Sequence, residues 1–206
     1  MNKPTPTIGR DASVRSKAVV MAKHGVCPWW VGYILASPIR KLAQNPARML
    51  KPFVRVGMTV LEPGPGMGFF TLELARLVGP EGRVIAVDVQ PQMIAGLRRR
   101  AERAGLIDRI ETRLAPAATM GLEGYDGAAD FVLAFAVVHE MPSAAKFFTE
   151  AARAMKSGAR LLLAEPVGHV SKDDFENELA LAAEAGLATV DRPLISRSQA
   201  AVLKKV

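Results

Sequence analysis

From Met58 onward, short apolar runs alternate with segments in which apolar residues recur every three or four positions. The first pattern is typical of buried strands and the second of amphipathic helices. Strands are expected to include Val60 and Leu61 and to span 83–88, 109–114, 129–135, 159–165, 187–192 and 197–205. Helices are expected over 71–77, 91–104, 143–156 and 171–185, the last two capped by Ser143 and Ser171. Glycines that are expected to end the helices before the next strand are Gly79, Gly105, Gly158 and Gly186. Repeated strand–helix units predict an α/β fold with a parallel sheet that is covered by helices on both faces.

The N-terminal part of the chain lacks this alternation. Residues 1–16 are polar and contain Pro4 and Pro6, so they are expected to form a disordered tail. Residues 17–51 contain helix-like stretches punctuated by Pro38 and Pro46, which predicts a helical cap segment. Residues 52–206 then form the main domain.

The first strand-to-helix connection is rich in glycine. After Val60 and Leu61, Gly64, Gly66 and Gly68 stand at every second position. Glycines allow a close approach of backbone to ligand, and the following helix presents unpaired N–H groups, so a nucleotide-like ligand is expected. A dinucleotide fingerprint would need its third glycine at position 69, which is Phe69. A nicotinamide-dependent oxidoreductase is therefore disfavoured.

The glycine spacing and its flanks resemble a known family. Glu62 precedes the glycines in an E-x-G-x-G-x-G pattern, and the next strand ends at Asp88, shortly before Pro91. This combination resembles the class I S-adenosylmethionine-dependent methyltransferases. The resemblance implies a doubly wound, Rossmann-like, mostly parallel seven-stranded sheet with an antiparallel last strand and an N-terminal helical extension. It also implies S-adenosylmethionine as the cofactor and S-adenosylhomocysteine as its product.

The resemblance further implies which residues hold the cofactor. Asp88 would accept hydrogen bonds from the two ribose hydroxyls, and Glu62 would fix the methionine amino end. The family often has an acidic or amide residue after the third strand, but this chain has Ala115 there, so a backbone group of Ala115 is expected to substitute. The complete expected set is Glu62, Pro63, Gly64, Gly66, Met67, Gly68, Asp88, Val89, Gln90, Met93, Ala115 and Phe135.

Candidate acceptor-side residues follow the fourth and fifth strands. His139 is a candidate catalytic residue, as a general base or to orient an acceptor hydroxyl, because its proton affinity lies near neutrality; a purely structural histidine is the alternative. Glu165 and His169 are expected to approach the same edge of the sheet and to contact the substrate. Four residues of the cap segment have two equally good interpretations, as substrate-wall residues or as residues that simply pack the segment onto the domain. They are Cys27, Trp29, Trp30 and Tyr33.

Composition and charge narrow the function further. The 206 residues fit one domain, and the single cysteine fits a reducing, cytoplasmic setting. His24 and Cys27 alone make too few ligands for a metal site, so none is expected. The apolar run from Val26 to Ala36 is too short to span a membrane, and the protein is interpreted as soluble.

The expected acceptor is a small molecule, apolar or aromatic, because a tryptophan-rich cap would cover it with an apolar surface. The net charge of +7 leaves an RNA methyltransferase as an alternative. However, the basic residues are dispersed, and the segment from Phe135 to Pro142 lacks the Asn/Asp-Pro-Pro-aromatic motif of enzymes that methylate exocyclic amines. A non-catalytic cofactor-binding protein is a further alternative, because a fold does not fix a function.

Overall fold

The computed structural model describes residues 45–206. The predictions for the tail 1–16 and for residues 17–44 of the cap segment lie outside the described residues. The end of that segment forms α3 (Pro46–Leu50). Asn45 caps this short helix, because its side chain accepts a hydrogen bond of 3.1 Å from the Arg48 N–H.

Seven strands form one sheet in the order β3-β2-β1-β4-β5-β7-β6. Their bounds are β1 Thr59–Pro63, β2 Arg83–Asp88, β3 Ile110–Leu114, β4 Ala129–Phe135, β5 Met155–Pro166, β6 Leu187–Asp191 and β7 Ser198–Lys205. β7 runs antiparallel to both of its neighbours, whereas the pairs from β3 to β5 are all parallel. This arrangement confirms the predicted Rossmann-like sheet with an antiparallel last strand.

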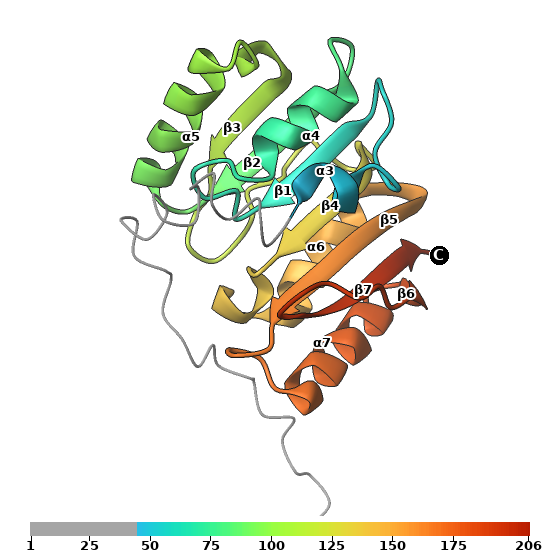
Figure 1. The fold of residues 1–206 in the computed structure, drawn as a ribbon. Coiled ribbons are helices and arrows are strands. Elements are labelled where there is room, and N and C mark those ends of the chain that lie inside the picture. Colours follow the sequence, from blue (N-terminus) through green and yellow to red (C-terminus); the bar gives the residue numbers. More distant parts are fainter. Residues whose placement is uncertain (1–44) are drawn as a thin grey trace, which may run out of the picture.

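Helices cover both faces of the sheet (Figure 1). α4 (Thr71–Val78) and α5 (Pro91–Arg103) pack with α3 against one face, where Val60 and Val84 contribute to the core. α6 (Ala144–Ala154) and α7 (Lys172–Glu184) pack against the other face, where Leu61 contributes. Val60 and Leu61 are both completely buried. Neighbouring strand residues must therefore both be apolar, which explains the unbroken apolar runs of the sequence.

The helix starts match local sequence signals. α5 begins at Pro91, where the missing N–H removes no helical hydrogen bond. Ser143 caps α6 by accepting the Lys146 N–H, and Ser171 caps α7 by accepting the Asp174 N–H. These caps fix where each helix leaves the strand ends. They therefore position the connecting loops that surround the site.

The largest difference from the predicted bounds lies at the junction of α6 and β5. The helix expected to reach Lys156 ends at Ala154, and β5 begins at once with Met155. Gly158, which was expected to end that helix, lies inside β5 with a φ of +73°. The register against β4 shifts here, since Ala129 pairs with Met155 but Phe131 pairs with Arg160. Gly158 thus lies at an irregularity of the strand. From the sequence alone, such a glycine looks the same as one that ends a helix.

The sheet order creates the crevice in which a ligand is expected. From β1 the chain proceeds outward through β2 to β3, and it then returns to β4 on the other side of β1. The loops after β1 and β4 therefore leave the sheet toward opposite faces. Such a switch point leaves an opening beyond the carboxyl ends of the strands.

Candidate cofactor and acceptor site

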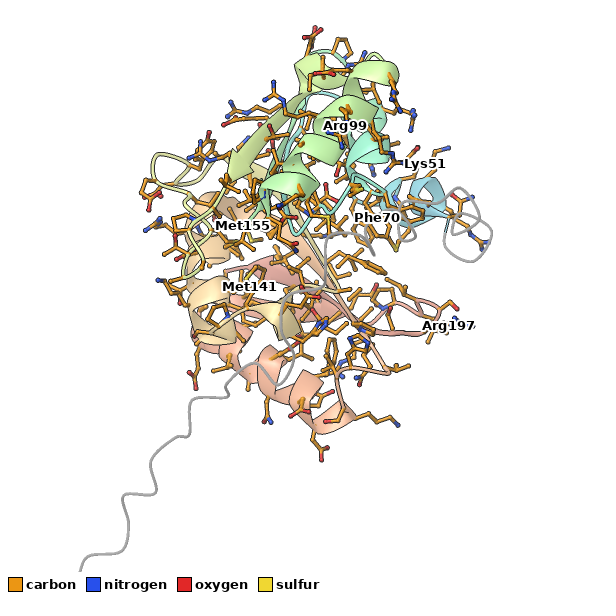
Figure 2. The ribbon with its side chains drawn as sticks, turned by 90° about the vertical axis from the view of Figure 1, so that its left-hand side faces the viewer. Lys51, Phe70, Arg99, Met141, Met155 and Arg197 are labelled. Atoms are coloured by element: carbon orange, nitrogen blue, oxygen red, sulfur yellow. The ribbon has the colours of Figure 1, made fainter. Side chains whose placement is uncertain are left out.

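A cavity of about 330 Å³ opens at this switch point. Phe70 at the start of α4 and Met141 before α6 both line this cavity, and both are labelled in Figure 2. Apolar side chains predominate in the lining, and among the lining carboxylates are Asp88 and Glu140. A concave, largely apolar cavity with a few polar groups is typical of a small-molecule site.

The glycine loop forms one wall of the cavity. Gly66 has a φ of +53°, and a Cβ added there would meet no atom within 4 Å. Nothing in the described protein therefore fills the space above Gly66, and a ligand can approach its backbone. Gly64 differs, because a Cβ there would lie 2.6 Å from Val137 Cγ2. Gly64 lets the loops after β1 and β4 pack together.

α5 holds the loop from behind. A Cβ on Gly68 would lie 2.5 Å from Leu97 Cδ1, so this glycine allows α5 to pack closely. The Arg100 guanidinium donates a short hydrogen bond to the Met67 carbonyl. Burial lowers the pKa of Arg100. The loop conformation is thus fixed by packing and by a charge-assisted hydrogen bond before any ligand arrives.

Asp88 lies at the end of β2 and lines the cavity. Its Oδ1 accepts the Gln90 N–H at 2.8 Å. Burial raises the pKa of Asp88 to about 6; the N–H groups of Gln90, Gly66 and Val89 oppose the rise, and the charge of Glu140 adds to it. The carboxylate is therefore oriented by backbone donors at the place where a ligand diol would be recognised.

Glu62 lies beside the cavity rather than in its lining, and its residue surface is 3% exposed. Within residues 45–206, its Oε2 has no hydrogen-bond partner. Burial raises the pKa of Glu62 to about 8, the nearby Thr71 hydroxyl lowers it, and the charge of Asp88 raises it. A buried carboxyl oxygen without a donor is the group that a ligand ammonium would satisfy.

A second polar cluster lies next to the cavity. Glu165 at the end of β5 is completely buried. Its Oε1 accepts the N–H groups of Val137 at 3.2 Å and Val138 at 2.8 Å, and its Oε2 makes a short contact with His139 Nδ1. His139 lies in the 3₁₀ turn η2 (Val138–Glu140). Glu165 therefore has protein partners at both of its carboxylate oxygens.

His169 completes this cluster. Its Nδ1 lies 3.4 Å from His139 Nε2, and the two rings meet edge to face. Burial opposes the charge on His139, but the hydrogen bond and charge of Glu165, together with the charge of Glu140, raise its pKa. The structure thus brings His139, Glu165 and His169 into contact. Their roles in catalysis and substrate binding stay predictions.

Most of the residues expected to bind the cofactor line one cavity. These are Pro63, Gly64, Gly66, Met67, Asp88, Val89, Gln90, Met93, Ala115 and Phe135. Glu62 and Gly68 are outside the lining, next to Pro63 and Met67, which are part of it. The predictions for Cys27, Trp29, Trp30 and Tyr33 lie outside the described residues.

Other lining residues were not expected from the sequence. Phe69 and Phe70 follow the glycines directly, and an aromatic pair at that place is a signal that could have been used. The loop 117–120 and one face of α6, with Lys146, Phe147 and Glu150, also line the cavity. They gave no comparable signal, because the crossover connections alone bring them to this edge of the sheet.

Comparison with known proteins decides the family. Residues 55–200, more than half of the chain, match the family described as a methyltransferase domain. The chain belongs to this methyltransferase family. Membership confirms the predicted class I fold and S-adenosylmethionine as the cofactor. The open backbone at Gly66, the carboxylate of Asp88 and the unsatisfied oxygen of Glu62 fit that group.

Similar proteins have different annotated acceptors or none. An uncharacterised protein of a Streptomyces fradiae transposon is 34% identical over 112 residues, which are 54% of this chain and 31% of that protein. Arsenite methyltransferase of Halobacterium salinarum is 29% identical over 138 residues, which are 66% of this chain and 34% of that protein. The matches span about a third of the length of these relatives, and they do not define the acceptor of this methyltransferase.

A solved structure gives a more complete match. The chain is 25% identical to an S-adenosylmethionine-dependent methyltransferase from Aquifex aeolicus, with a TM-score of 0.78. The alignment covers 88% of this chain and 100% of the other. The similarity therefore extends through the sheet and its helices rather than the glycine loop alone.

Every helix within residues 45–206 is too short or too polar to cross a bilayer. No group of three or more potential metal ligands is found in the same range.

Proposed function

We propose that this methyltransferase domain transfers the methyl group of S-adenosylmethionine to a small, apolar or aromatic acceptor. The observation that carries the proposal is the aromatic wall of the cavity. Phe70 packs against Phe135 with ring centroids 4.6 Å apart, and Phe69 packs against Phe70 at 4.9 Å. All three rings line the cavity. Such a wall favours a flat or apolar partner over a strongly hydrated one.

The positions of the lining residues support the proposed cofactor-binding roles. Asp88 would accept hydrogen bonds from the ribose hydroxyls, and Glu62 would pair with the methionine ammonium. Val89, Gln90 and Met93 would surround the adenine together with the backbone of Ala115. Bound in this way, the cofactor supplies an electrophilic methyl group. The chain then holds donor and acceptor in line, which can lower the barrier by about 7–11 kcal/mol.

His139 is the proposed catalytic residue on the acceptor side, as a general base or to orient an acceptor hydroxyl. Its neighbours Val137 and Glu140 line the cavity, and Glu165 holds its ring. His169 is proposed to contact the acceptor from the loop after β5. Cys27, Trp29, Trp30 and Tyr33 remain proposed substrate-wall residues of the cap segment. A cytoplasmic location is also part of the proposal.

The charges around the cavity support a small acceptor over RNA. Within residues 45–206, the lining includes the carboxyl groups of Asp88, Glu140 and Glu150 but only one ammonium group, that of Lys146. Lys146 itself lies 3.9 Å from Glu150. These carboxylates favour the cationic sulfonium and repel phosphates, although the whole chain is basic.

Calorimetric titration of the full chain with S-adenosylhomocysteine and, separately, with NADH tests the cofactor site. We expect S-adenosylhomocysteine alone to bind, and Asp88→Ala to weaken this binding at least tenfold, since two charge-assisted hydrogen bonds are lost. Asp126→Ala, which removes an exposed carboxylate of the Arg153 ion pair, is the control and should bind normally. Binding of NADH, or equal binding by Asp88→Ala, would refute the proposed site.

Mass spectrometry of methylated products tests the acceptor class. A panel of small phenols and other aromatic compounds is incubated with the chain and S-adenosylmethionine, beside an equal mass of unmodified RNA. Methylation of a small compound is expected. Methylation of RNA alone would favour the nucleic-acid alternative, and cofactor binding without any methyl transfer would favour a non-catalytic protein.

A further inference from the structure

Glu165 has an unusual set of contacts for a buried carboxylate. One oxygen accepts two consecutive peptide N–H groups, from Val137 and Val138, and the other holds His139 Nδ1. Two peptide N–H groups and one imidazole nitrogen thus surround a fully buried carboxyl group. The two oxygens contact different parts of one loop, because Val137 lines the cofactor cavity and His139 lies outside the lining.

The backbone before these N–H groups is shaped to meet the carboxylate. Ala136 has a φ of +54°, a conformation that residues other than glycine rarely adopt. Its own N–H bonds to the Ala164 carbonyl at 2.8 Å, which continues the pairing of β4 with β5. After this left-handed residue the next two N–H groups converge on one oxygen, in the manner of a backbone anion nest. Strain at Ala136 is thus tied to the carboxylate of Glu165.

We propose that Glu165 is a positioning residue that fixes the cofactor wall with one oxygen and the tautomer of His139 with the other. The inference rests on the proposed function and deepens it. Oε1 holds Val137 in contact range of the glycine loop, and this oxygen therefore helps to shape the cavity wall. Since Oε2 is a carboxyl oxygen that accepts a hydrogen bond from Nδ1, His139 carries its proton on Nδ1 and keeps the lone pair on Nε2. Glu165 then acts through His139 and does not touch the substrate.

The surroundings of the imidazole agree with this assignment. His169 Nδ1 lies 3.4 Å from His139 Nε2, and Glu140 is the other charged group of η2. From α7, Glu178 interacts electrostatically with Glu165. The carboxylates around His139 stabilise its protonated form. A base held in this way accepts a proton on Nε2 without reorienting its ring.

Glu178 provides a matched control. It is also buried, at 8% exposure, but its Oε2 has no hydrogen-bond partner within residues 45–206. Burial raises the pKa of Glu178 to about 8, and the charges of Glu165 and Asp174 add to the rise. At pH 7 its side chain is therefore mostly a neutral acid, for which glutamine is a close substitute. Glu165→Gln, by contrast, removes a charge.

Glu165→Gln separates the two tasks. The amide oxygen can still accept the N–H groups of Val137 and Val138, which leaves the NH₂ group facing His139 Nδ1. A donor at this position forces the histidine proton onto Nε2. Nitrogen-15 NMR of the histidine rings reports this proton directly. The chain has three histidines, and His139→Gln identifies the signal of His139.

In wild type and Glu178→Gln we expect the neutral His139 to carry its proton on Nδ1. In Glu165→Gln we expect the proton on Nε2 and a proton affinity at least about tenfold lower, because the charged acceptor is gone. Retention of the Nδ1 proton in Glu165→Gln would overturn the proposal. An equal change in Glu178→Gln would also overturn it, since the effect would then follow from any loss of a buried carboxyl.

Calorimetry with S-adenosylhomocysteine completes the test. Glu165→Gln should bind it within about threefold of wild type, because the amide oxygen keeps the wall in place. A much larger loss of affinity in Glu165→Gln would contradict the separate tasks of the two oxygens. Failure of the wild type itself to bind would refute the proposed function. The NMR result on His139 would still decide the tautomer, so the two failures are distinguishable.

Discussion

Glu62 is expected to make cofactor binding depend on pH. Its carboxyl group is buried, one of its oxygens has no hydrogen-bond partner within residues 45–206, and burial raises its pKa to about 8. At pH 7 most of the ligand-free protein therefore carries a proton on Glu62. Pairing with the cofactor ammonium requires the carboxylate, so binding must release this proton.

The magnitude follows from the pKa values. A group with a pKa of about 8 in the free protein and well below 6 in the complex releases about 0.9 proton at pH 7. The affinity for S-adenosylhomocysteine should then rise about twentyfold from pH 6 to pH 7.5. Asp88, with a pKa of about 6, adds about twofold over the same interval. The direction is fixed, because affinity must increase with pH when protons are released.

Calorimetry at pH 6 and pH 7.5, in two buffers with different ionisation enthalpies, measures both affinity and released protons. Glu62→Gln should bind more weakly at pH 7.5 and keep only the twofold pH dependence of Asp88. Glu178→Gln is the matched control, because its carboxyl has a similarly raised pKa but belongs to α7, which contributes no residue to the cavity lining, whereas Glu62 directly precedes lining residues of the glycine loop. It should behave as wild type.

Two results would refute this reasoning. One is a wild-type affinity that changes less than about threefold over the interval, with no proton released. The other is a Glu62→Gln variant that keeps the full pH dependence. Either would mean that Glu62 remains protonated in the complex, or that the ammonium binds elsewhere.

Three further substitutions have defined outcomes. Glu178→Gln should raise the free energy of unfolding at pH 7 by about 3 kcal/mol. Below pH 4.5 the wild-type carboxyl is protonated in both the folded and the unfolded state, so it does not lower stability. As the pH rises toward 8, the unfolded state loses this proton more readily than the folded state, and the folded protein becomes less stable. Denaturant titration at pH 4.5 should therefore show no difference between the variant and wild type. Gly66→Ala should reduce S-adenosylhomocysteine affinity at least tenfold and stability by only about 1 kcal/mol, because its methyl group would enter open space in a left-handed conformation. Gly64→Ala should reduce stability by about 2–4 kcal/mol, since the methyl group would also clash with Val137; equal denaturation midpoints for the two glycine variants would contradict this.

The fold was largely predictable because its signals are local. Apolar runs such as Ala129–Phe135 must be strands buried on both faces, and β4 has these bounds. Serine caps and post-helix glycines marked most helix ends. The exception at Gly158 shows the limit of such signals, since a left-handed glycine serves a strand irregularity as well as a helix end.

The placement of the residues expected to bind the cofactor was predictable for a similar reason. Glu62, the glycines and Asp88 lie within two consecutive strand–loop–helix units, and parallel neighbouring strands bring their carboxyl ends together. Their spacing in the sequence therefore nearly defines their spacing in space. The same spacing does not reveal which glycine packs and which stays open, because Val137 comes from β4 and Leu97 from α5.

The fold class, the family and the residue types at the strand ends can be inferred from the sequence alone. The burial and the hydrogen-bond partners of the carboxyl groups, in contrast, depend on the tertiary structure. Glu165 and Glu178 look alike in the sequence, yet one collects three donors and the other has an oxygen with no hydrogen-bond partner within residues 45–206. Burial and hydrogen bonding depend on elements that are distant along the chain, so the chemistry of a buried ionisable group is set by packing and not by local sequence.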